Sequence, residues 1–199
     1  MNLSTQEFEA AIAVAANRNM KDRQEPLMVL YKQDAKQAQI VDMAKTTSSR
    51  IPASTALYSE VSAGHNTPES YAIGVHQAVG GLSDYATPGD LFCAAIAACL
   101  DSTIRIISNR LSIPLKSLSV VVKAEVDVRG TLRVDDSVPV GFQDIQIEVD
   151  LQAMMQLPEA TVRSILNAAE HSCVVLQTLK NTPSISVATA TEKLMGNAA

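Results

Sequence analysis

Cysteine is the residue type in this sequence best suited to covalent chemistry, and it occurs at Cys93, Cys99 and Cys173. Three cysteines do not form a secreted disulfide framework, and the first residues lack the features of a signal peptide, so we expect a protein of a reducing, cytoplasmic compartment. There, a buried cysteine is either a small apolar packing residue or a redox-active thiol. Cys99 and Cys173 are the candidates for the redox role. Cys93 lies six residues before Cys99, on a different helical face, and is expected to pack.

A thiol becomes a nucleophile only when its surroundings stabilise the thiolate. Cys99 lies about three turns from the start of its predicted helix, so the helix dipole contributes little. The candidate cations are Arg50, Arg105 and Arg110. Arg50 precedes a predicted hairpin and could fold over the site, whereas Arg110 lies about 16 Å further along the same helix and Arg105 points elsewhere. The sequence alone does not choose among them.

Other site chemistries lack their motifs. There is no Gly-x-Ser-x-Gly, no phosphate-binding glycine loop, no dinucleotide fingerprint and no Cys-x-x-Cys pair for zinc, so we expect no cofactor and no metal. His171 lies two residues before Cys173 and would point away from that sulfur on a helix, as a surface or interface residue. The net charge of -5 and the aromatic content of 4% argue against nucleic-acid binding.

The element that carries Cys99 is a predicted helix over residues 87–111. Thr87 can cap its first turn, a proline follows, and Asp90 completes a capping box. Residues 91–100 are all apolar, and a helix that is apolar all round is expected to be buried all round. This run is too short to cross a bilayer, which needs about 20 residues, so we expect no membrane association. One sheet covers only one side of such a helix, and a second copy of the chain is the simplest cover for the rest. We therefore expect an obligate homodimer.

Strands are predicted before and after this helix because apolar and polar residues alternate there. They are expected at residues 55–61 and 70–79, as a hairpin, and at residues 118–129 and 145–152, as antiparallel neighbours. A second helix is predicted from Pro158 through Cys173 to Lys180, with a short strand over residues 184–190. This order of elements predicts an α+β fold in which antiparallel sheet packs against helices.

We expect an N-terminal extension over residues 1–52, a main domain over residues 53–190 and a tail over residues 191–199. Within the extension, the sequence pattern predicts an amphipathic helix at residues 4–18, a hairpin of residues 27–31 and 39–43, and a linker at residues 45–52.

The run from Gly80 to Cys99 resembles the OsmC/Ohr family, in which a glycine-rich loop and a proline open a central helix whose apolar run ends in Ala-Ala-Cys. Residues 169–174, Ala-Glu-His-Ser-Cys-Val, resemble the second cysteine motif of the family, and residues 181–187 resemble its closing strand. The resemblance spans residues 54–190. It implies an OsmC-like fold, with antiparallel sheets packed around two central helices in an intertwined homodimer.

The best-known members of this family are thiol-dependent peroxidases that act in oxidative stress defence. By the resemblance, Cys99 would attack an organic hydroperoxide, release an alcohol and become a sulfenic acid. Cys173 would condense with it to a disulfide, which an external dithiol reductant would reduce.

The sequence departs from the peroxidases of the family at three places. Residues 55–79 contain no counterpart of the family's early arginine, and Arg50 is the nearest. The glutamate at the helix start is replaced by Gly89, followed by Asp90, and Val174 stands where proline is usual. The retained cysteine pair favours a peroxidase, with Arg50 and Asp90 as supporting residues. The departures favour an OsmC-like dimer that binds a small apolar ligand without turnover, and a third alternative is that the cysteines only pack.

Overall fold

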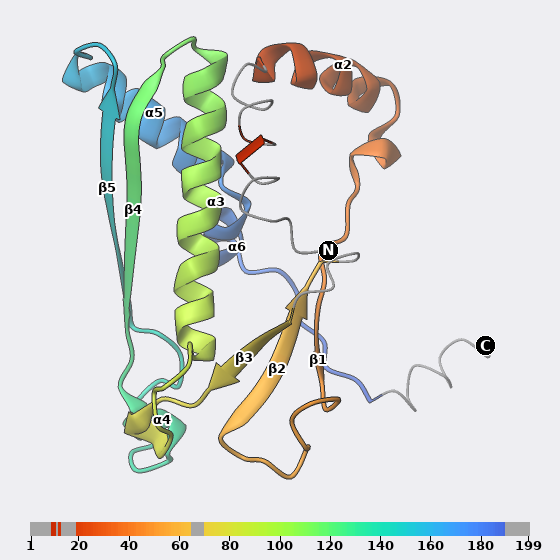
Figure 1. Cartoon of the computed structure of the whole chain (residues 1–199), viewed down its shortest axis with the longest axis vertical. Helices are drawn as coiled ribbons and strands as arrows, with labels where there is room; N and C mark the ends of the chain where they lie inside the picture. The colour runs from red at the N-terminus through yellow and green to blue at the C-terminus, as the bar shows by residue number, and fades with distance from the viewer. Residues whose placement is uncertain (1–8, 11, 13–18, 65–69, 190–199) are drawn as a thin grey trace.

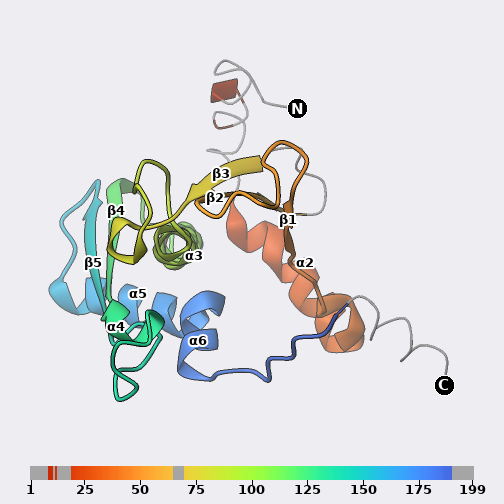
Figure 2. The same cartoon turned by 90° about the horizontal axis from the view of Figure 1, so that it is seen from below.

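The long helix α3 (Pro88–Arg110) lies at the centre of the fold, with the other elements around it (Figures 1 and 2). The computed structural model describes residues 9, 10, 12, 19–64 and 70–189. The further elements, in chain order, are α2 (Met20–Gln33), a 3₁₀ turn (Ala35–Ala38), β1 (Ala44–Thr47), β2 (Tyr58–Ala63), β3 (Ser70–Gly74), a second 3₁₀ turn (Gln77–Val79), β4 (Leu115–Glu125), α4 (Val128–Thr131), β5 (Asp144–Ala153), α5 (Glu159–Ser172) and α6 (Val174–Lys180). The predicted α+β class with antiparallel sheets is confirmed.

Helix α3 begins with the predicted capping box. The Oγ1 of Thr87 accepts a hydrogen bond from the backbone N–H of Asp90 at 3.3 Å, and the Oδ2 of Asp90 accepts one from the backbone N–H of Thr87 at 2.8 Å. Pro88 follows at the first helical position, where its missing N–H leaves no bond unmade. The predicted start and length of this helix are therefore confirmed.

Within the single chain only one face of α3 is buried. The expectation that this helix is buried on all sides is therefore wrong for the single chain. Its buried residues recur every fourth position: Ile96, Leu100, Ile104 and Ser108. They face β4, α5 and α6, which lie beside α3 in Figure 2. The opposite face carries exposed small residues such as Ala94 and Ala98. By length and composition α3 could span a membrane, but the core helix of a folded domain passes the same test. Its packing against a sheet and two helices is that of a core helix.

Strands β4 and β5 pair antiparallel beside α3, and they confirm the alternation that the sequence shows. Their half-buried side chains come from alternate positions, including Val120 opposite Val149 and Val122 opposite Ile147. The predicted continuation of β4 to residue 129 is wrong. The side chain of Asp127 instead caps the short helix α4, so the chain turns there.

The predicted hairpin before α3 is confirmed as β2 and β3, and β1 adds a third antiparallel strand on the other edge of β2. The predicted continuation of its second strand to residue 79 is wrong, because β3 ends at Gly74 and residues 77–79 form a 3₁₀ turn. The linker predicted at residues 45–52 is therefore wrong at its start, where Lys45, Thr46 and Thr47 pair with β2. Two of these three residues are β-branched, and such residues favour a strand when a neighbouring strand, here β2, is available to pair with them.

The hairpin predicted in the N-terminal extension is also wrong, because residues 27–31 lie in helix α2. The side chain of Asn19 caps this helix, and its lysine, arginine, glutamine and glutamate residues are good helix formers. Pro26 lies inside α2, where it omits one backbone hydrogen bond without ending the helix. The helix predicted at residues 4–18 falls largely outside the described residues. Within this range the structure describes residues 9, 10 and 12, and all three are helical.

The second predicted helix is interrupted at Cys173, which has an extended backbone (φ -77, ψ 108) between α5 and α6. The strand predicted at residues 184–190 is wrong for the described part, where residues 184–189 form no strand. Ile185 is 80% exposed and Val187 is 96% exposed, since no described strand pairs with this segment.

Candidate active site

The fold brings Cys99 and Cys173 together in one cluster. Cys99 lies in the middle of α3, and Cys173 lies at the break between α5 and α6. Cys173 is fully buried in the core with Ile96 and Ile165, and half-buried Cys99 packs against this core. Both are free thiols of this one cluster. The two cysteines chosen from the sequence are therefore neighbours, although nothing in their spacing along the chain required it.

The surroundings of Cys173 keep its thiol protonated. Burial raises the pKa of the Cys173 thiol above its ordinary value, and the hydrogen-bonding and electrostatic interaction with Cys99 raises it further. The backbone N–H groups of Leu176 and Val175, in the first turn of α6, oppose these effects. Because the net shift is upward, Cys173 is a proton-bearing thiol at neutral pH.

Arg50 is held by partners of its own in the first sheet. Its Nε donates to the Oε1 of Glu60 at 2.9 Å, and its Nη2 donates to the Oγ of Ser70 at 2.6 Å. The guanidinium lowers the pKa of Glu60, and the Ser70 hydroxyl lowers it further. Glu60 is only 4% exposed, so β2 carries a buried carboxylate that sequence reasoning missed. The signal was an acidic residue inside a predicted strand.

The other two candidate arginines are also engaged elsewhere. Arg105 pairs with Asp101 at 2.6 Å on the surface of α3, and the Nη1 of Arg110 donates to the Oε1 of Gln24 at 2.8 Å. The single chain therefore places all three arginines against partners other than Cys99.

The remaining candidate residues lie in surroundings that favour a structural role. Asp90 is part of the cap of α3, where hydrogen bonds from the backbone and the side chain of Thr87 lower its pKa. His171 is exposed on α5, as expected, and Cys93 is half-buried. Among the residues that the structure describes, no three His, Cys, Asp or Glu side chains come together as metal ligands.

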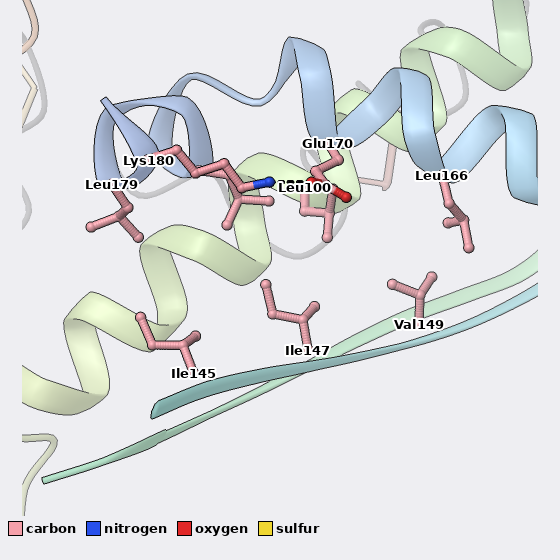
Figure 3. A pocket seen from close by; sticks show the side chains of 9 residues that line it. Leu100, Ile145, Ile147, Val149, Leu166, Glu170, Leu179 and Lys180 are labelled. Atoms are coloured by element: carbon pink, nitrogen blue, oxygen red, sulfur yellow. Dashed lines mark hydrogen bonds and ion pairs between the residues drawn. The ribbon is translucent and has the colours of Figure 1, made fainter. Parts of the chain in front are cut away.

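A pocket of about 480 Å³ opens between β5 and the helices α3, α5 and α6 (Figure 3). Apolar side chains form most of its wall, and an ion pair between Glu170 and Lys180 lies at its edge. The lining residues are Leu100, Ile145, Ile147, Val149, Leu166, Glu170, Leu176, Leu179 and Lys180. Sequence reasoning missed this pocket because its residues come from four separate elements. Only the inward positions of β5 were visible in the alternation pattern.

Comparison with known proteins agrees with this fold. The family model described as OsmC-like protein matches residues 81–188. No curated protein sequence matches the chain. Among solved structures, an OsmC-like protein from Mycoplasma pneumoniae has a TM-score of 0.57 at 10% identity, with 72% of this chain and 90% of that chain covered.

Two further structures are similar. An OsmC-like protein of unknown function from Vibrio cholerae has a TM-score of 0.55 at 11% identity, with 70% of this chain and 94% of that chain covered. An organic hydroperoxide resistance protein from Elizabethkingia anophelis has a TM-score of 0.50 at 18% identity, with 72% and 91% covered. At such identities the likeness shows the fold, while the family model covers more than half of the chain. The chain therefore belongs to the family of OsmC-like proteins.

Proposed function

We propose that this protein is a thiol-dependent peroxidase that reduces organic hydroperoxides, with Cys99 as the peroxidatic residue and Cys173 as the resolving residue. The observation that carries the proposal is that two free thiols far apart in the chain, Cys99 of α3 and Cys173 at the break between α5 and α6, meet at one core cluster. Membership of the OsmC-like family supports the same reaction class.

The unequal burial of the two cysteines supports their roles. Cys99 is half-buried and Cys173 is fully buried, so Cys99 is the more accessible of the two to a substrate, and the raised pKa of Cys173 favours its protonated form. A resolving thiol does not need to meet the peroxide; it needs only to meet the oxidised partner. The thiolate of Cys99 attacks the terminal peroxide oxygen, and the O–O bond breaks. The alkoxide takes up a proton and leaves as an alcohol, and Cys99 becomes a sulfenic acid.

The second step joins the two sulfurs. Cys173 attacks the sulfenic sulfur, the hydroxyl leaves as water together with the thiol proton, and a disulfide forms. An external dithiol of the reducing cytoplasm then restores both thiols by exchange, supplying two electrons and two protons. Neither step requires a metal or a cofactor from the protein.

Activation of Cys99 requires a positive group, and we propose Arg50 for this role. The Nε and Nη2 of Arg50 are bound to the first sheet, and its Nη1 remains as a donor. Asp90 acts indirectly, as the cap that fixes the start of the helix carrying the thiol.

We also propose that the protein is a homodimer in which two copies pack through the exposed face of α3. Ala94, Ala98 and Ser102 are exposed at intervals of four residues, and small side chains at this spacing let two helices approach closely. Such a dimer would cover the apolar surface of α3 that the single chain leaves open.

The test is to mix the reduced protein with one equivalent of cumene hydroperoxide and count free thiols over the following second. We expect rapid loss of two thiols, no loss in Cys99→Ser, and a sulfenic acid trapped by dimedone in Cys173→Ser. Cys93→Ser is the matched control and should behave as the parent protein does. Thiols that remain intact after minutes would overturn the proposal.

A second candidate function is the binding of a small apolar ligand without turnover. The observation that favours it is the largely apolar pocket beside the cysteine pair, since ligand sites are typically concave, apolar and equipped with few polar groups.

A further inference from the structure

The two cysteines of the core cluster are covered to different degrees. Cys173 has 0% of its surface exposed and lies in the core with Ile165 and Leu176. Cys99 packs against this core from its edge and is half-buried. Cys99 is therefore the more accessible of the two to a thiol that arrives from solvent.

The part of α3 next to Cys99 carries small side chains on its solvent side. Ala95, Ala98 and Ser102 lie within four residues of Cys99, and all three are exposed. Thr103 is also short, and its Oγ1 donates to the backbone carbonyl of Cys99 at 2.7 Å. Small neighbours on this side obstruct an approaching thiol less than long side chains do.

The proposed dimer keeps this approach at its edge. Successive residues of an α-helix are about 100° apart around its axis, so Cys99 lies about a quarter turn from Ala98. Ala98 is the middle residue of the face through which we propose that two copies pack, and Cys99 therefore lies at the side of that face. The dimer and the access of a thiol to Cys99 are compatible.

Access decides which sulfur of a Cys99–Cys173 disulfide is attacked. In thiol–disulfide exchange an entering thiolate attacks one sulfur, and the other sulfur leaves with the electron pair of the broken bond. Burial raises the pKa of the Cys173 thiol, which slows its departure, and backbone hydrogen bonds from Leu176 and Val175 lessen this effect. Attack on Cys173 itself would require the core to open first, because none of its surface is exposed. Access therefore outweighs the quality of the leaving sulfur.

We propose that Cys99 is the site at which external thiols become attached to this protein, and that Cys173 is the sulfur released when they attach to the disulfide form. The ligand class is a small thiol or dithiol that enters beside Ala95 and Ser102. The inference rests on the disulfide of the proposed function, and it adds the position at which the reductant binds covalently.

The reduction then consists of two balanced exchanges. The thiolate of the reductant attacks the Sγ of Cys99, the disulfide bond breaks, and Cys173 leaves with the electron pair and takes up a proton. The second thiol group of the reductant, as its thiolate, attacks the reductant sulfur that is bound to Cys99. This step releases Cys99 and leaves the reductant as a disulfide. The reductant supplies two electrons, and its two thiol protons balance the two thiols that are restored.

The first experiment locates the mixed disulfide. A Cys93→Ser background leaves only the pair able to react, and diamide prepares the disulfide form, since its N=N bond takes up the two electrons and two protons that the thiols release. The protein is then treated briefly with glutathione, whose single thiol stops at the mixed disulfide, quenched in acid and labelled with N-ethylmaleimide. Trypsin separates the two cysteines, because it cleaves after Arg105 and Arg163. We expect glutathione on the peptide of Cys99 and maleimide on the peptide of Cys173.

The second experiment tests the attachment site without peroxide or diamide. The reduced protein is mixed with the aromatic disulfide dithiodipyridine, which reacts with an accessible thiolate and releases a coloured product. In the Cys93→Ser background, Cys173→Ala should keep the fast release. Cys99→Ala should slow it at least about tenfold, because Cys173 reacts only from a locally opened form. In guanidinium chloride the two variants should react at equal rates, which shows that both thiols are intact.

Glutathione on Cys173, or equal rates for the two variants in the native state, would overturn the inference. Failure of the proposed function is seen separately. If diamide forms no disulfide within the chain, the resolving role of Cys173 is wrong, and the reaction with dithiodipyridine still decides whether Cys99 is the attachment site. If glutathione is found on Cys99 but cumene hydroperoxide leaves the thiols intact, the peroxidase is refuted and the attachment site stands.

Discussion

The Nε of Arg50 donates to the Oε1 of Glu60 across 2.9 Å and thereby ties the loop before β2 to a buried position of that strand. Glu60 is 4% exposed, and a buried carboxylate remains ionised only when a cation or hydrogen-bond donors compensate for its lost hydration. Arg50 and Ser70 provide both. The guanidinium of Arg50 is thus held at a fixed place on the first sheet.

The ionisation of Glu60 should make stability depend on acid pH. Its pKa in the folded chain is below the ordinary value of 4.5, chiefly through Arg50, so the folded state favours the charged form. This contribution is fully present above pH 4.5 and is lost as the pH falls through the folded-state pKa. We expect Glu60→Gln to be less stable than the parent at neutral pH, with a difference that shrinks below pH 4.5. Urea unfolding across this range measures it, and a difference that grows in acid would contradict the expectation.

Replacement of Arg50 should slow the oxidation of Cys99. Removal of one charged donor from a reacting centre typically reduces the rate about a hundredfold or more, and we expect Arg50→Gln to show a loss of this order. Stopped-flow measurement of thiol loss with cumene hydroperoxide gives the rate. Arg105→Gln is the matched control, because that arginine pairs with Asp101 on the surface of α3. If both variants react at the parent rate, Arg50 does not activate the thiol.

A charge on the exposed face of α3 should separate the proposed dimer. In Ala98→Glu, two carboxylates would be brought into a close, apolar helix contact, and an unpaired buried charge is strongly unfavourable. We expect sedimentation at micromolar concentration to give a dimer for the parent and a monomer for this variant. Ser119→Glu places the same charge on the outward face of β4 and should remain dimeric. A parent protein that sediments as a monomer rules out the dimer itself.

Removal of the cap of α3 should reduce stability by a known amount. Thr87→Ala removes the Oγ1 that accepts from the backbone of Asp90, and loss of such a cap costs about 0.5–2 kcal/mol. The free energy of unfolding in urea measures the change. Ser119→Ala, an exposed substitution, should stay within about 0.5 kcal/mol of the parent. An equal effect of the two substitutions would show that the cap contributes nothing.

Local signals predicted the elements best where one signal dominated. The capping box of Thr87 and Asp90 fixed the start of α3, and strict alternation predicted β5. The hairpin predicted at residues 27–31 and 39–43 was wrong, because a helix of 14 residues tolerates Pro26 and its one missing hydrogen bond when its cap and flanking residues favour the helix. The strand β1 was missed because its residues pair only when β2 supplies an edge.

The candidate site was predictable in its residue types but not in its geometry. The cysteine pair could be chosen from sequence and resemblance, whereas no helix-breaking residue marks the break at Cys173, which the sequence continues as one helical pattern. The contacts of Arg50 and the pocket beside β5 arise from residues far apart in the chain. A pattern of neighbouring residues in the sequence does not predict contacts between residues that lie far apart in the chain.

Ile185 and Val187 are largely exposed, and among the described strands β5 pairs only with β4, so one edge of β5 is open. Both features affect how the chain behaves during refolding. An unpaired strand edge and exposed β-branched side chains are both surfaces at which chains can aggregate. If a second copy covers this surface, refolding becomes a competition between correct pairing and uncontrolled association. Refolding yield should then peak at an intermediate chain concentration, because dilute chains lack a partner and concentrated chains precipitate.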